Sequence, residues 1–167
     1  FNEAKVLPRK LANTLDLDYP REKFEILIVD SGSTDSTRTI VHDLIQKERQ
    51  VKIRLLTQDE RLGKSAALNY ALENCSSEIV VFSDADVVAS KDALLQAAAN
   101  FNDLKVGAVS GIEVIQNPDE SSTTKLERGY RSFYNTLRLG ESNLDSVMMC
   151  ESEFSAYRRE LLGAIPC

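Results

Sequence analysis

The sequence predicts an α/β fold with a doubly wound, mostly parallel sheet, and three observations lead to this prediction. Two short apolar runs, at Phe24–Asp30 and Ile79–Phe82, suit strands that are buried on both faces. Helical patterns alternate with strand patterns along most of the chain, which is the order that a parallel sheet requires. The chain has 167 residues, which is enough for one domain with a substantial core.

The chain begins with a helical pattern. Leu7, Leu11 and Leu15 recur at helical spacing and form one apolar face. Proline is tolerated only in the first turn of a helix, so Pro8 sets the start of this helix near Val6.

The next elements are a strand, a helix and a second strand. The buried strand at 24–30 leads into turn-forming residues at 31–35, where Asp35 is predicted to order the turn or to cap the helix that follows at 36–46. Residues 51–55 alternate between apolar and basic side chains, which predicts a strand with one wetter face.

A polar loop then leads to an alanine-rich helix at 64–75, the buried strand at 79–82, a helix at 91–101 and a longer strand at 106–115. These elements complete a first half of the domain, residues 1–115. Because the carboxyl ends of parallel strands meet at one edge of a sheet, Asp30, Leu56 and Asp84 should face a single crevice.

The rhythm changes in the second half, residues 116–167. Residues 121–139 form one long helical pattern with bulky aromatic side chains, which either line a groove or cover the edge of the sheet. Short strands are predicted at 146–149 and 154–158, and a further helix at 159–164.

Composition excludes several classes of function. The net charge of −6 and the isoelectric point near 4.9 argue against a nucleic-acid-binding protein, which needs clustered Lys and Arg. Cys75, Cys150 and Cys167 lack metal-ligand spacing and are predicted to be reduced thiols of a cytoplasmic protein. His42, the only histidine, lies in a helical stretch, which argues against a Ser-His-Asp triad or a histidine-rich metal site.

The expected location is therefore the cytoplasm, or the cytoplasmic face of a membrane in a longer protein. No apolar run is long enough to span a bilayer, so any membrane contact would come from segments outside this chain. The chain begins at Phe1 and stops just after a helical pattern, so we expect it to be truncated at both ends.

Two carboxylates directly follow the buried strand at 79–82. Asp84 and Asp86 lie one residue apart where the strand opens into a loop, and like charges this close favour a shared cation. Oxygen ligands alone suit Mg²⁺ or Mn²⁺, which keep open positions for phosphate groups. The alternative is that both are turn residues and one of them caps the next helix.

Two other segments suggest a phosphorylated ligand. Gly63 and Lys64 open a helix, where free N–H groups, the helix dipole and a mobile positive charge attract anions. Arg61 is a further candidate for the same contact. Asp30, at the end of its strand, is placed to accept the ring N–H of a nucleotide base. The alternatives are a solvated lysine in an ordinary loop and a turn or capping role for Asp30.

Four fragments in this order resemble the family 2 glycosyltransferases with the GT-A fold: Phe1-Asn2-Glu3, Val29–Asp35, Arg61–Asn69 and Ser83–Asp86. The resemblance covers nearly the whole chain, and Phe154–Leu161 also looks like the family's segment under the acceptor site. It implies a Rossmann-like, nucleotide-binding GT-A domain. It further implies an inverting enzyme that uses a nucleotide-diphosphate sugar, with UDP-sugar favoured.

The resemblance also assigns roles to individual residues. It places Glu3 and Asp30 on the base and the Asp-x-Asp pair on the sugar and metal, beside the phosphate contact already predicted for Gly63 and Lys64. Of that pair, Asp84 would touch the ribose or sugar as well as the metal, and Asp86 would be the main metal ligand. Ser31 stands where many members have a second aspartate, so no nucleotide contact is assigned to it.

Two parts of the family pattern are absent from the sequence. The resemblance implies a general base beyond Cys167, and the candidates within the chain are Glu151 and Glu153, near the acceptor region. The alternative is that both are loop residues. The first, central strand of the family would precede Phe1. Its absence would leave unpaired groups on both neighbouring strands, so we expect residues before Phe1, or another chain, to fill that gap.

Two other functions remain open at this point. A sugar-phosphate nucleotidyltransferase also uses a doubly wound sheet and Mg²⁺, but it would release pyrophosphate rather than a nucleoside diphosphate. A non-catalytic module that binds a nucleotide sugar would need no general base. The acceptor, which the sequence does not identify, would be a glycan, a lipid or a small molecule.

Overall fold

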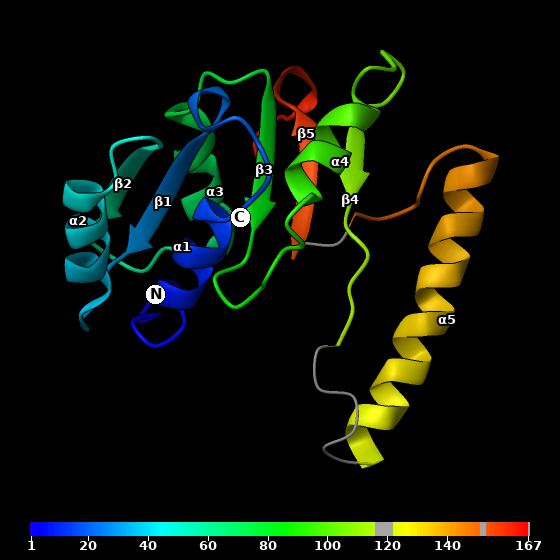
Figure 1. The fold of residues 1–167 in the computed structure, drawn as a ribbon, viewed down its shortest axis with the longest axis horizontal. Coiled ribbons are helices and arrows are strands. Elements are labelled where there is room, and N and C mark those ends of the chain that lie inside the picture. The colour runs from blue at the N-terminus through cyan, green and yellow to red at the C-terminus, as the bar shows by residue number, and fades with distance from the viewer. Residues whose placement is uncertain (116–121, 151–152, 167) are drawn as a thin grey trace.

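The structure is a computed structural model that describes residues 1–115, 122–150 and 153–166. It has the predicted α/β architecture (Figure 1). The elements are, in chain order, α1 (Leu7–Leu15), η1 (Arg21–Lys23), β1 (Glu25–Ser31), α2 (Thr37–Lys47), β2 (Lys52–Gln58), α3 (Lys64–Glu73), β3 (Ile79–Ser83), α4 (Ala93–Asn100), β4 (Ala108–Ser110), α5 (Ser122–Leu144), β5 (Phe154–Arg158) and η2 (Arg159–Leu161).

The described strands form two sheets. β1 and β2 pair in parallel over their whole length, from Glu25 opposite Lys52 to Ser31 opposite Gln58. In the second sheet β5 lies between β3 and β4 and is antiparallel to both. Figure 1 shows the two sheets side by side, with β1 and β3 running in the same direction. The carboxyl ends of β1 and β3 therefore lie at the same edge of the molecule.

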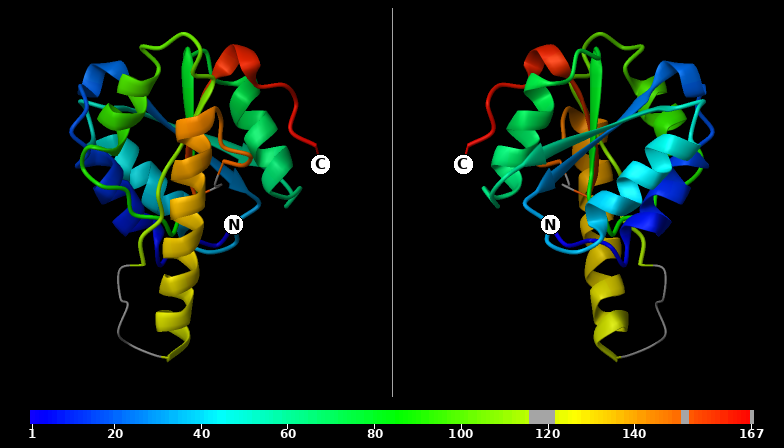
Figure 2. Two further views of the ribbon diagram at one scale, coloured as in Figure 1. Left: turned by 90° about the vertical axis from the view of Figure 1, so that its right-hand side faces the viewer. Right: turned by 90° about the vertical axis from the view of Figure 1, so that its left-hand side faces the viewer.

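Helices cover both faces of these sheets, as a doubly wound fold requires. Figure 2 shows α1, α2 and α4 on one face and α3 on the other. One core cluster centres on Leu7, Leu11 and Val41, and a second on Phe101 and Ala156. The apolar runs recognised in the sequence supply the strand side of both clusters, because Ile26, Ile28 and Leu55 pack on the first and Ile79 and Val81 on the second.

The two sheets are not paired with each other among the described strands. Among the described strands, β1 pairs only with β2, and β3 pairs only with β5. Each therefore has one edge without a strand partner within residues 1–115 and 153–166. That residues before Phe1, or another chain, fill the place of the missing strand remains a prediction.

Three predicted elements differ from the structure. The strand at 106–115 is only Ala108–Ser110, because its partner β5 begins at Phe154, whose carbonyl accepts the N–H of Gly111. Beyond the strand, Asn135 and Arg138 of α5 donate to Glu113 O at 3.1 Å and to Gly111 O at 3.4 Å. Residues 146–149 form no strand, and the N–H of Met148 donates to Glu141 Oε2 instead. The helix at 159–164 is a single 3₁₀ turn, since the backbone is already extended at Leu162.

The long helix α5 stands away from the rest of the molecule (Figure 1). Its polar side chains face the body, where Arg131 pairs with Glu113, while several apolar side chains are exposed: Leu126, Tyr130, Phe133 and Leu137. Within the described residues, none of the helices combines the length and the apolar character that crossing a bilayer demands.

Candidate functional site

Asp30, the penultimate residue of β1, carries a buried carboxylate with one hydrogen-bonded oxygen and one without a partner among the described residues. Its Oδ2 accepts the N–H of Ser33 at 3.2 Å and Nε of Arg38 at 2.5 Å. Its Oδ1 is buried and has no hydrogen-bond partner within the described part of the chain. Burial alone would raise the pKa of Asp30, but the bonds from Ser33 and Arg38 outweigh it and hold the pKa below its usual value. Asp30 is thus an anion with one acceptor oxygen to spare.

The loop after β1 is held against the loop after β2. Ser31 Oγ donates to Gln58 Oε1 at 2.8 Å and accepts the N–H of Leu62 at 3.4 Å. Gly32 has φ +71°, and a Cβ there would come within 3.3 Å of the backbone at Glu60 and Arg61. A glycine is needed here because the turn is left-handed and the two loops touch.

The N-terminal segment closes over the same loop. The N–H groups of Asn2, Glu3 and Ala4 donate to Ser33 Oγ, Thr37 Oγ1 and Asp35 Oδ2, at 2.9, 2.9 and 3.2 Å. Asp35 also accepts the N–H of Thr37, the first residue of α2, and so orders the turn, the first of its two predicted roles; the N-cap of the helix is Ser36. The backbone of Glu3 is therefore fixed beside the loop that begins at Asp30.

The segment Gly63-Lys64 meets the acidic pair directly. Gly63 is the N-cap of α3 with φ +91°, and no side chain caps the free N–H groups of the first turn. Lys64 Nζ lies 2.6 Å from Oδ1 and 2.9 Å from Oδ2 of Asp84. Both side chains remain partly open to solvent, so this ion pair lies at an accessible helix N-terminus.

The acidic pair is presented by a tight turn at the end of β3. The N–H of Val87 donates to Asp84 O at 3.3 Å, and the N–H of Asp84 donates to Glu153 O at 3.2 Å. Asp86 is exposed, and its carboxylate accepts no hydrogen bond from the described residues. The structure thus brings Glu153 to the pair through its backbone, whereas Glu151 lies outside the described residues.

One residue of this site was not predicted from the sequence. Lys10 of α1 donates from Nζ to Ser83 Oγ at 2.5 Å and to Val87 O at 2.9 Å, on either side of the acidic pair. Burial lowers the pKa of Lys10, while the charges of Asp84 and Asp86 oppose that shift. The available signal was its position on the buried face of the helix, three residues after Leu7.

The donor set fits a hard divalent cation that also binds a ligand. No group of three or more His, Cys, Asp or Glu side chains that could hold a metal occurs in residues 1–115, 122–150 and 153–166. Asp84 and Asp86 would supply only two carboxylates, and an ammonium already lies where a cation would neutralise Asp84. Mg²⁺ in particular is commonly held by one or two carboxylates plus phosphate oxygens.

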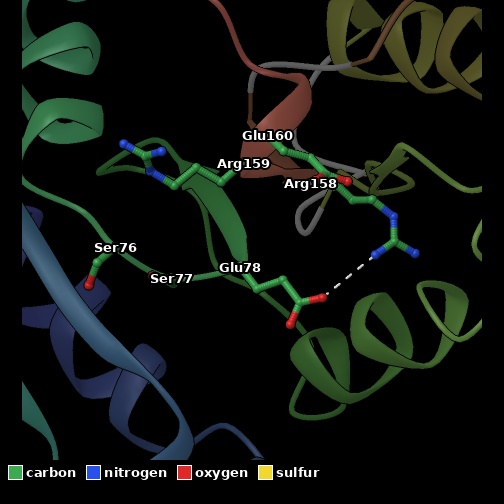
Figure 3. A pocket seen from close by; sticks show the side chains of 6 residues that line it. All are labelled: Ser76, Ser77, Glu78, Arg158, Arg159 and Glu160. Atoms are coloured by element: carbon green, nitrogen blue, oxygen red, sulfur yellow. Dashed lines mark ion pairs between the residues drawn. The ribbon is translucent and has the colours of Figure 1, made fainter.

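The pocket in Figure 3 lies at the other end of β3 and is not part of this site. It has a volume of about 280 Å³ and is lined by Ser76, Ser77, Glu78, Arg158, Arg159 and Glu160. Its two arginines serve the fold, because they bind backbone carbonyls at the ends of helices. Arg159 donates to Leu72 O in α3 at 2.9 Å, and Arg158 donates to Phe101 O at the end of α4 at 2.8 Å.

Arg158 is also held by two further carbonyls, Asp103 O at 3.1 Å and Val106 O at 2.9 Å. Glu78, the acidic residue of the pocket, is 3.9 Å from it and largely exposed. At the carboxyl ends of β1 and β3, hydrogen bonds and an ion pair connect the candidate residues on the surface. The arginines of the pocket at the opposite end bind backbone carbonyls and stabilise the fold.

Comparison with known sequences gives one family over almost the whole chain. Residues 1–165 match the family described as Glycosyl transferase family 2. A beta-monoglucosyldiacylglycerol synthase of Nostoc sp. (strain PCC 7120) is 35% identical over 124 residues, 74% of this chain and 26% of the relative. A poly-beta-1,6-N-acetyl-D-glucosamine synthase of Staphylococcus aureus is 29% identical over 160 residues, 95% of this chain and 38% of the relative.

Solved structures agree with these relatives. The mannosyltransferase PcManGT from Pyrobaculum calidifontis, in complex with GDP-Man and Mn²⁺, has a TM-score of 0.85 and 37% identity. It covers 99% of this chain, which spans 45% of that protein. TarS 1–349 of S. aureus, in complex with UDP-GlcNAc, has a TM-score of 0.60 and 26% identity over 72% of this chain and 36% of its own. This chain therefore spans less than half of each of these proteins.

Proposed function

This chain belongs to glycosyl transferase family 2, and on that premise we propose that it binds a nucleoside-diphosphate sugar and transfers the sugar to an acceptor hydroxyl with inversion. The observation that carries the proposal is the contact between Lys64 and Asp84. It joins the N-terminus of α3, which suits a diphosphate, to the acidic pair, which suits a metal. A diphosphate bridged to a metal needs these two features side by side.

Asp30 is the proposed base-binding residue, with Glu3 beside it. The unpartnered oxygen of Asp30 is an acceptor for a ring N–H, which both uracil and guanine offer. Because that oxygen is buried, a base reaches it only when neighbouring side chains shift. Relatives bound to UDP-GlcNAc and to GDP-Man are both known, so UDP-sugar, the donor favoured by the sequence, has to be tested against GDP-sugar.

Asp86 and Asp84 are the proposed metal ligands, and Gly63 and Lys64 the proposed diphosphate contacts. A bound Mg²⁺ or Mn²⁺ would neutralise the charge that develops on the diphosphate leaving group. Lys64 would move from Asp84 towards the phosphate oxygens, since an ammonium on a flexible stem can exchange one anion for another. The turn at Asp84 would keep both carboxylates at the edge of the sheet.

The transfer itself is a single displacement. The acceptor oxygen forms a bond to the anomeric carbon as the bond from that carbon to the phosphate oxygen breaks, and the electron pair leaves with the diphosphate. A general base takes the hydroxyl proton. Glu153, whose backbone adjoins Asp84, and Glu151 are the candidates within the chain, and a residue after Cys167 is the third.

The names of the relatives give two acceptor classes to test. One relative is a synthase of a glucosylated diacylglycerol and another a synthase of an N-acetylglucosamine polymer. A lipid and a glycan are therefore the first acceptors to test, before small molecules. The proposed location, the cytoplasm or the cytoplasmic face of a membrane, stays a prediction.

Binding of UDP and of GDP to the full chain, measured by calorimetry with and without Mn²⁺, tests the donor site. We expect one nucleotide to bind in a Mn²⁺-dependent way and Asp86→Ala to remove that dependence. Asp43→Ala is the matched control, because Asp43 is an exposed aspartate in α2, far along the chain from the acidic pair. Affinity that ignores both the metal and Asp86→Ala would contradict the metal assignment.

Analysis of released products tests the reaction class. A glycosyltransferase releases a nucleoside diphosphate, and a nucleotidyltransferase releases pyrophosphate. Release of pyrophosphate would replace the proposed function with the nucleotidyltransferase. Metal-dependent binding without any release would indicate a non-catalytic nucleotide-sugar-binding module.

A further inference from the structure

Polar side chains on one face of α1 contact residues 83–89, the segment that carries the acidic pair. Lys10 binds Ser83 and Val87, as described above. Asn13 binds Ala89 twice, donating from Nδ2 to its carbonyl and accepting its N–H, both at 2.9 Å. Asp16 pairs with Lys91 at 3.1 Å. Polar residues of α1 and its C-cap Asp16 thus bind residues from the end of β3 to the segment just before α4.

Lys10 differs from the other members of this face, because it brackets the two carboxylates. Ser83 directly precedes Asp84, and Val87 directly follows Asp86. Ser83 in turn donates from Oγ to Glu153 O at 3.1 Å, the carbonyl that also accepts the N–H of Asp84. One ammonium is therefore tied to both ends of the acidic turn and, through Ser83, to the start of β5.

The contacts of Lys10 leave the carboxylate oxygens available. Its hydrogen bonds go to a hydroxyl and a carbonyl, while Lys64 contacts both oxygens of Asp84. A charge held near two carboxylates, without contacting them, weakens their mutual repulsion and leaves their lone pairs for a cation. Lys64 competes directly with a metal for the oxygens of Asp84, whereas Lys10 contacts neither carboxylate.

We propose that Lys10 is a positioning residue for the acidic pair. It fixes the spacing of Asp84 and Asp86 before the cation arrives and holds that spacing while the metal and the diphosphate are bound. The inference rests on the proposed function, because it concerns the same metal site. Groups that orient metal ligands without touching the metal typically change metal affinity by about 10- to 100-fold when they are removed.

Three variants of the full chain test this role. Lys10→Met removes the charge and both hydrogen bonds and keeps the apolar stem. Lys10→Arg keeps a charge and donors at the same place. Asn13→Ala is the matched control, since it removes two hydrogen bonds from the same helix face to Ala89, which lies beyond the acidic turn. Thermal unfolding without metal reports folding, and electron paramagnetic resonance of free Mn²⁺, with UDP or GDP present, reports metal affinity.

We expect Lys10→Met to weaken Mn²⁺ binding about tenfold or more and Lys10→Arg to recover most of that loss. Asn13→Ala should lower the melting temperature at least as much as Lys10→Met while Mn²⁺ affinity stays within about twofold of the parent. Unchanged or tighter Mn²⁺ binding by Lys10→Met overturns the proposal. The gain from removing a positive charge that repels Mn²⁺ would then equal or exceed any loss from a less fixed carboxylate pair. An equal loss in Asn13→Ala also overturns it, since the effect would be general loosening of the segment.

Mn²⁺-dependent nucleotide binding by the parent protein distinguishes failure of this inference from failure of the proposed function. If the parent shows no Mn²⁺-dependent nucleotide binding, the proposed function and the role of Lys10 both fail. If the parent binds and only the Lys10 comparison fails, the function stands and the acidic turn is held by its other contacts. If Lys10→Met does not fold, the Mn²⁺ affinities of Lys10→Arg and Asn13→Ala are compared with that of the parent. The proposal requires Lys10→Arg to keep most of the parent affinity, and a large loss in this variant overturns it.

Discussion

The substitution Asp30→Asn separates the structural part of this carboxylate from its proposed binding part. The change keeps the shape of the side chain and removes its charge. The amide oxygen of asparagine can still accept from Ser33 and Arg38, but these bonds are then made to a neutral acceptor. The amide nitrogen takes the place of the buried Oδ1, where the described residues offer no partner.

Both effects have a definite size. A charged hydrogen bond is worth about 1.5–3 kcal/mol and a buried unsatisfied donor costs about 1–3 kcal/mol, so we expect the free energy of unfolding to fall by about 2 kcal/mol. At the nucleotide, an N–H donor now faces the N–H of the base. Losing one hydrogen bond to a charged acceptor corresponds to about 10- to 150-fold weaker binding of UDP or GDP.

Urea unfolding and nucleotide calorimetry measure the two effects separately. The pH dependence supplies a second check, because the folded pKa of Asp30 is depressed. Its ionised form stabilises the fold above its unfolded pKa of about 3.9, and that stabilisation is lost as the pH falls through the folded pKa. Asp30→Asn should lose less stability over that acid range than the parent. Parental nucleotide affinity in a folded Asp30→Asn protein would refute the base-binding assignment.

Three further substitutions probe the remaining contacts. Arg158→Met should reduce the free energy of unfolding by about 3 kcal/mol, seen as a lower urea midpoint, because three backbone carbonyls lose a charged donor; an unchanged midpoint would contradict this. Lys64→Met should weaken UDP or GDP binding about tenfold and leave binding of the nucleoside alone unchanged, and equal losses for both ligands would exclude a phosphate contact. Asp35 should titrate below about pH 3.9 in NMR spectra, because Thr37 binds its ionised form, and its stabilisation of the fold should fade as the pH falls through that pKa; Asp35→Asn should lack this fading.

The sequence predicts the local elements that carry the site. The apolar runs before Asp30 and Asp84 are strands in the structure, and Lys64 does open a helix. The apolar side chains of both strands are half-buried rather than fully buried as predicted, and each strand has one edge without a described strand partner. The predictions of the elements succeed because each depends on a short segment: a continuous apolar run for a strand, and a glycine before an alanine-rich stretch for a helix start. The contact between Lys64 and Asp84 lies at the edge where the sequence predicts that strand ends meet. It depends on α3 beginning and β3 ending at the same edge of the molecule.

What the sequence does not predict depends on distant partners. The strand at Phe154–Arg158 is predicted, but not its antiparallel place between β3 and β4. The predicted strand at 106–115 ends at Ser110, because its partner β5, more than forty residues further along the chain, begins at Phe154. Lys10 is the same kind of case, since its partners Ser83 and Val87 are more than seventy residues away. The helical pattern places Lys10 on the buried face of α1, but it does not identify Ser83 and Val87 as the partners.

The ion pair between Lys64 and Asp84 also constrains the order of binding at the proposed site. A metal that binds Asp84 competes with an ammonium that already contacts both of its oxygens. The pair is partly exposed, so its net strength is at most about 1 kcal/mol, and displacement weakens metal binding by no more than about fivefold. A diphosphate removes this penalty because it gives Lys64 another anion and gives the metal further oxygens. Metal and nucleotide should therefore bind cooperatively, with Mn²⁺ weak alone and tighter beside UDP or GDP. In Lys64→Met, Mn²⁺ alone should bind slightly tighter while this cooperativity falls, a pattern that an ion pair unrelated to ligand binding would not produce.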